Sequence, residues 1–160
     1  MAHRGIATLA LAIMTCFLLL SHFDPQFFVL HFYESLIYIA IVLLLFYFEE
    51  RWAYMLGITG PAGWLLLTFS TGGFGAFIRQ MSRVFHGEAP NYTAFFLGGI
   101  ISILSVAMIV VCTYRWKREF AGLGKGLGTF FVSAGIVAVY YAVLAIWFWR
   151  SVAVGAPPHS

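Results

Sequence analysis

The stretch from residue 92 to residue 114 reads YTAFFLGGIISILSVAMIVVCTY and contains no charged side chain. Because an α-helix rises about 1.5 Å per residue, a helix of this length extends about 35 Å. That length is enough to cross the hydrocarbon core of a bilayer, which is roughly 30 Å thick. The stretch ends where charge returns, at Arg115, Lys117 and Arg118. The sequence therefore predicts that residues 92–114 form a transmembrane helix.

Four further stretches have the same character, and each is bounded by charged or turn-forming residues. They cover about residues 6–23, 26–48, 52–70 and 129–149. Overall 62% of the chain is hydrophobic and only 9% is charged, whereas soluble domains contain about 25% charged residues. This composition excludes a water-soluble globular domain and a disordered chain. We expect an all-α polytopic membrane protein, in which residues 1–160 form a single membrane domain with five transmembrane helices.

The connection between the third and fourth spans has a helical pattern of its own. Over residues 74–86, apolar residues recur at helical spacing and polar residues fall on the opposite face. The apolar set is Phe74, Phe77, Ile78, Met81, Val84 and Phe85, and the polar set is Arg79, Gln80, Ser82 and Arg83. This pattern predicts a short amphipathic helix that lies in the interface between bilayer and water. The residues expected to make contacts there are Phe74, Phe77, Arg79, Met81 and Arg83.

Basic residues are distributed unevenly between the two sides of this membrane domain. The N-terminus and the second and fourth connections carry six of them, Arg4, Arg51, Arg115, Lys117, Arg118 and Lys125. The first and third connections and the C-terminal tail carry three, Arg79, Arg83 and Arg150. Because cytoplasmic loops retain Lys and Arg, we expect a cytoplasmic N-terminus and an external C-terminus, in a bacterial cytoplasmic membrane. The net charge of +3 then reflects topology, and no nucleic-acid partner is expected.

Small residues form stripes along the last two spans. One stripe contains Ala94, Gly98, Ser102, Ser105 and Cys112, and the other contains Ala134, Ala138, Ala142 and Ala145. Helices associate in lipid through close packing at small residues and through hydrogen bonds, because lipid is as apolar as leucine. We therefore expect both stripes to pack against neighbouring helices, and the two spans to pack against each other.

Ionisable residues gather near the junction of the first two spans. His31 and Glu34 lie one helical turn apart, and His22 and Asp24 precede them at a similar depth. Three interpretations remain open. The residues form a structural hydrogen-bonded pair, they bind zinc or another non-haem metal, or His31 is an axial ligand of a haem or chlorophyll-type tetrapyrrole. The sequence does not choose between a tetrapyrrole, a bound lipid and no cofactor.

The third span is interrupted near its middle by Gly60 and Pro61. Proline removes a backbone hydrogen bond and glycine loosens a helix. A broken helix at this depth is typical of transporter sites, although a kink that only helps packing gives the same pattern. Together with His31 and Glu34, the break suggests a small transporter or channel as an alternative function.

Buried charge is scarce in this sequence. Glu34 is the only acid well inside a predicted span, and no Lys or Arg accompanies it. Enzymes and ion-driven transporters that work within the bilayer usually carry several such groups. We therefore expect a non-catalytic accessory subunit that packs against partner helices, lipids or pigments in a larger membrane complex. Respiratory and photosynthetic electron-transfer complexes are the natural hosts for such subunits.

Overall fold

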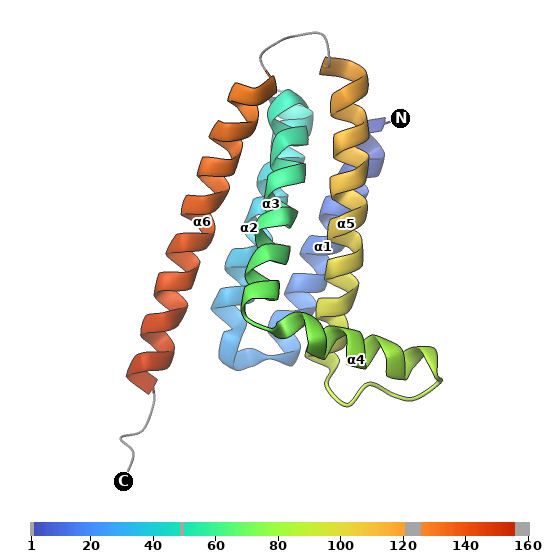
Figure 1. Ribbon diagram of the computed structural model, residues 1–160, viewed down its shortest axis with the longest axis vertical. Helices are drawn as coiled ribbons and strands as arrows, with labels where there is room; N and C mark the ends of the chain where they lie inside the picture. The colour runs from blue at the N-terminus through green and yellow to red at the C-terminus, as the bar shows by residue number, and fades with distance from the viewer. Residues whose placement is uncertain (1, 49, 121–125, 156–160) are drawn as a thin grey trace.

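The computed structural model describes residues 2–48, 50–120 and 126–155 (Figure 1). These residues form an all-α structure, as predicted. Its elements are α1 (Ala2–Phe23), a 3₁₀ turn η1 (Pro25–Phe27), α2 (Phe28–Tyr47), α3 (Glu50–Ser70), α4 (Gly73–Phe85), α5 (Thr93–Phe120) and α6 (Gly126–Gly155).

The helices have the length and hydropathy of an integral membrane protein. Within the described ranges, α1, α2 with its preceding turn, α5 and α6 each contain a stretch that could cross a membrane. α3 has the required length and hydropathy only when it is taken together with α4, and the two helices are bent by 95° relative to each other. The described residues therefore contain four candidate spans, or five if this bent pair counts as one. This arrangement confirms the predicted fold class.

α3 does not have the hydropathy of a membrane span by itself, and its neighbours cover much of its surface. It packs against α2, α5 and α6, and ten of its residues are buried. Figure 1 shows α3 between α5 and α6, with α1 and α2 behind it and with the start of α1 and the end of α6 at opposite ends of the bundle. The side chains of Phe17, Tyr38, Ile101 and Met108 are fully buried in the core between these helices.

The helices do not end where the predicted spans end. α5 continues six residues beyond the predicted boundary at Tyr114 and ends at Phe120. Arg115 and Glu119 lie one turn apart in this extension, with 3.7 Å between guanidinium and carboxylate. Such an i,i+4 pair is compatible with helix in water. Charge therefore marks where the apolar stretch ends, not where the helix stops.

α4 is close to the predicted amphipathic helix and leaves the bundle sideways. The side chains of Phe77 and Met81 lie over Gly98 and Gly99 of α5, where any Cβ would overlap them. Gln80 was expected on the polar face but is buried, and its Oε1 accepts a hydrogen bond from the Asn91 backbone N–H at 3.0 Å. A buried amide is tolerated there because this bond satisfies it.

The expectation that α5 and α6 pack against each other is wrong. α5 packs against α1, α3 and α4, and α6 packs mainly against α3. Within the stripe of α5, Ser102 donates to the Gly98 carbonyl at 2.9 Å and Ser105 is fully buried. The α5 stripe is packed as expected, but Ala138, Ala142 and Ala145 of the α6 stripe are exposed. The buried face of α6 is formed instead by Ser133, Val137, Tyr141 and Leu144.

Replacing Gly98 by leucine should detach α4 from α5, because the new side chain would occupy the place of the Phe77 ring. We expect a loss of about 1–3 kcal/mol of stability, as for other overpacked sites, measured as a lower apparent melting temperature in detergent. Gly135→Leu is the matched control, since a Cβ there meets nothing within 4 Å. Equal melting temperatures of the two variants would contradict this packing.

Candidate functional site

The polar residues predicted near the first two spans meet at the end of the bundle where α4 leaves it. Nδ1 of His31 lies 2.9 Å from Oε2 of Glu34, one turn further along α2. Nε2 of the same ring lies 4.0 Å from Oδ2 of Asp24, which precedes η1. The side chains of His31 and Glu34 are only 13% and 7% exposed. The imidazole is therefore held between two carboxylates in a nearly closed environment.

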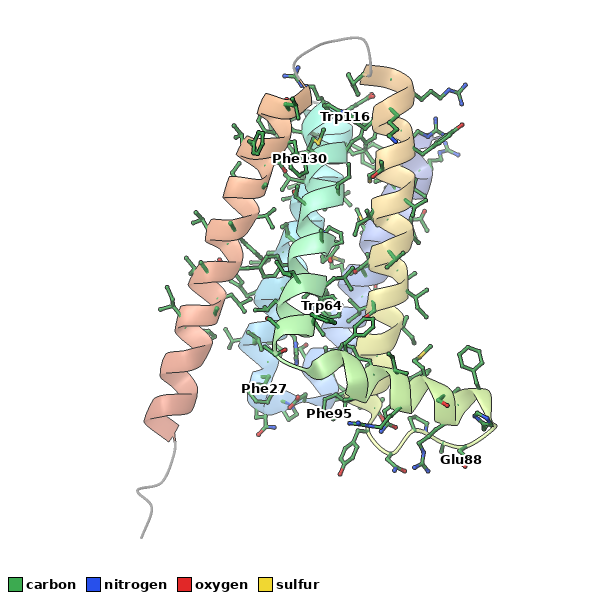
Figure 2. The ribbon with its side chains drawn as sticks, viewed as in Figure 1. Phe27, Trp64, Glu88, Phe95, Trp116 and Phe130 are labelled. Atoms are coloured by element: carbon green, nitrogen blue, oxygen red, sulfur yellow. The ribbon has the colours of Figure 1, made fainter. Side chains whose placement is uncertain are left out.

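A cavity of about 170 Å³ lies beside these three residues. Every described helix except α6 contributes to its wall. The lining residues are Leu20, Asp24, His31, Glu34, Trp64, Thr68, Thr71, Gly73, Phe77, Ala94 and Phe95. Figure 2 shows Trp64 and Phe95 near the first turns of α4. The cavity thus combines acidic groups and hydroxyls with aromatic walls.

His22 does not belong to this cluster. It is exposed near the end of α1, it is absent from the cavity wall, and its ring contacts Phe23 at 5.5 Å between centroids. The sequence placed it at the right depth, but the helical rotation of α1 turns it away from His31.

The geometry bears on the metal and tetrapyrrole interpretations. Within the described ranges, no group of three or more His, Cys, Asp or Glu side chains is arranged to hold a metal ion. Nδ1 of His31 is engaged by Glu34, and a cavity of about 170 Å³ is smaller than the roughly 300–1,000 Å³ of typical small-molecule sites. The cavity beside His31 therefore does not fit a macrocycle.

The polar face of α4 is tied to its own loop. Arg83 forms a salt bridge with Glu88 at 2.9 Å, and Arg79 is exposed. On the apolar face, Phe85 is 82% exposed and Phe74 36% exposed. These exposed rings lie on a helix nearly perpendicular to α3, which suits contact with the interface of a bilayer.

Pro61 does not break α3, because the α-helix runs without interruption from Glu50 to Ser70. Pro61 is fully buried, and the neighbouring Gly60 lies against Ile37 of α2. The Tyr141 hydroxyl of α6 donates to the Gly60 carbonyl at 3.3 Å. The interpretation of α3 as two half-helices around a transport site is wrong, because α3 is continuous and the neighbouring helices pack closely against this segment.

Two apolar grooves flank α3 on the outside of the bundle. The first lies between α3 and α6 and has a volume of about 740 Å³. The second lies between α3 and α5 and has a volume of about 640 Å³. Ala62 and Leu66 of α3 line both grooves. The sequence identified the alanine stripe of α6. It did not predict that this stripe lies beside an open groove, because the groove forms only when α6 pairs with α3.

Comparison of the chain with protein-family models, with curated proteins and with solved structures gave no match.

Proposed function

We propose that this chain is a non-catalytic subunit of a larger membrane complex and that a transmembrane helix of a partner subunit docks between α3 and α6. The observation that carries this proposal is the open groove along α6. Ala134, Ala138, Ala142 and Ala145 all line it, and the last three are exposed. The groove follows this stripe for three turns, about 16 Å of helix.

The chemistry of the groove favours a helix as its occupant. On the α3 side the groove is lined by the small residues Thr59 and Ala62, one turn apart, and by larger side chains such as Leu66. Small residues allow helix backbones to approach closely, which is the main source of helix association in lipid. Contact with disordered acyl chains requires no such pattern.

The polar groups deep in this part of the bundle already satisfy one another. The hydroxyls of Thr59 and Ser133 are 2.8 Å apart across the contact between α3 and α6, and Thr59 also donates to the Met55 carbonyl at 2.9 Å. Glu34 is the only ionisable acid or base among the buried polar residues in the described part of the chain. This supports a role in packing in preference to chemistry within the bilayer.

The test is gentle purification of the complex from native membranes, followed by identification of the proteins that comigrate with the chain. We expect several unrelated polypeptides in the wild type, and loss of at least one when Ala138→Leu and Ala142→Leu fill the groove. Val139→Phe is the control, because Val139 is 65% exposed and does not line the groove.

Two results would contradict the proposal. A stable homo-oligomer that carries no other polypeptide and moves a solute across vesicles would favour the small transporter or channel. Unchanged comigration in the leucine variant would show that the partner binds elsewhere. An absorption spectrum of the same sample would show whether the host complex carries electron-transfer pigments.

We further propose that the N-terminus faces the cytoplasm, with α4 on the external side. The first turn of α3 and the last two turns of α5 lie at the end of the bundle opposite α4 (Figure 1). These turns carry Arg51, Arg115 and Lys117, and basic residues are retained in the cytoplasm.

Labelling with a membrane-impermeant maleimide tests this orientation in a Cys16→Ala, Cys112→Ala background. Ala89 and Lys117 are exposed at opposite ends of the bundle. We expect Ala89→Cys to be labelled in intact cells and Lys117→Cys only after permeabilisation. The reverse pattern would invert the topology.

A further inference from the structure

The cavity between Asp24, His31 and Glu34 has the features of a binding site for an organic cation. We propose that it binds a substituted ammonium group, which is supplied by a free small amine or by the amine headgroup of a lipid. This inference is independent of the docking of a partner helix between α3 and α6.

The first argument is the balance of charge. Two carboxylates, of Asp24 and Glu34, face a single imidazole. Only Oε2 of Glu34 is bonded to His31, and a carboxylate can accept about four hydrogen bonds. The Asp24 oxygen lies at 4.0 Å from the ring, beyond hydrogen-bond distance. Both carboxylates therefore retain acceptor capacity for the N–H groups of a cation.

The second argument is the hydroxyl group of Thr68, which does not belong to the acidic cluster. Thr68 lines the cavity and is only 8% exposed. Its hydroxyl has no hydrogen bond to any residue in the described part of the chain, whereas the neighbouring Thr71 donates to the Thr68 carbonyl at 3.1 Å. The hydroxyl oxygen is not among the fully buried atoms that lack a partner, so it stays accessible from the cavity and can form a hydrogen bond with a ligand there.

The third argument is the aromatic wall, which selects the kind of cation. The rings of Trp64 and Phe77 stack with 6.2 Å between centroids and 6° between planes, and Phe95 lies 6.2 Å from Phe77. Aromatic rings attract ammonium groups, with tryptophan the strongest. They offer no ligands to a divalent metal, which needs several oxygen or nitrogen donors.

The size and place of the cavity limit the ligand further. A volume of about 170 Å³ admits a group of a few heavy atoms, because one water in the liquid takes about 30 Å³. The cavity lies under the first turns of the amphipathic α4, at the level where lipid headgroups meet an interfacial helix. Both a dissolved amine and a lipid headgroup could therefore reach it.

The experiment uses the full chain, purified in detergent without amine lipids. Isothermal titration calorimetry with ethylammonium chloride at constant ionic strength should show saturable binding of one equivalent, and sodium chloride should show none. Glu34→Gln and Asp24→Asn should each weaken binding at least about tenfold, as expected for a lost charged hydrogen bond. Phe95→Leu should weaken it about two- to fivefold.

The lipid source is tested in nanodiscs of phosphatidylethanolamine against nanodiscs of phosphatidylglycerol. If the ligand is a lipid headgroup, phosphatidylethanolamine raises the melting temperature of the wild type but not of Asp24→Asn, and ethylammonium binds weakly or not at all. Glu88→Gln is the control throughout, because Glu88 pairs with Arg83 outside the cavity.

Three outcomes would overturn the proposal. The first is that neither ethylammonium nor phosphatidylethanolamine has an effect. The second is that sodium binds as tightly as ethylammonium. The third is that Asp24→Asn and Glu34→Gln bind the probe as tightly as the wild type does. Asp24 is 23% exposed, so Asp24→Asn keeps the test decisive even if Glu34→Gln fails to fold.

Discussion

Three glycines of α3 determine how closely the other helices approach it. A Cβ on Gly57 would lie 2.6 Å from Sγ of Cys112 in α5, and one on Gly60 would lie 3.1 Å from Ile37 in α2. A Cβ on Gly63 would lie 2.8 Å from Val137 in α6. Real Cβ atoms do not fit at the two shorter distances, so any larger residue would displace the side chain of Cys112 or Val137, or the helix that carries it. Since lipid provides no hydrophobic force between helices, the bundle depends on such close contacts.

This arrangement explains the unusual composition of α3 and links the fold to the proposed function. A helix surrounded by three neighbours can carry glycine, threonine and proline where a lipid-facing helix would carry leucine. It also holds α6, at Gly63 and the Thr59–Ser133 hydrogen bond, while Tyr140 of α6 stacks on Tyr33 of α2 and donates a hydrogen bond to its carbonyl. The remaining face of α6 is left to lipid or to a partner. The polar cavity lies at the end of the same helix, where Trp64 and Thr68 complete its wall.

The sequence predicted the helices well and their neighbours poorly. Hydropathy located the spans and the amphipathic α4 within a few residues, because burial in a bilayer depends on local composition. It also placed His31 beside Glu34, since both lie on one turn of α2. The same patterns misassigned Gly60 and Pro61 as a break, paired α5 with α6, and included His22. Trp64, Thr68 and Phe95 were not recognised as part of the polar site, because their proximity arises only when α3, α4 and α5 pack together.

The most direct test of this account is the contact between α3 and α6 in the membrane. The hydroxyls of Thr59 and Ser133 are 2.8 Å apart, which is compatible with a disulfide after replacement of both residues. In a background without Cys16 and Cys112, Thr59→Cys combined with Ser133→Cys should cross-link almost completely on mild oxidation of native membranes. If that pair stays reduced while Ser105→Cys combined with Ser133→Cys cross-links, α6 packs on α5 and the central position of α3 is wrong.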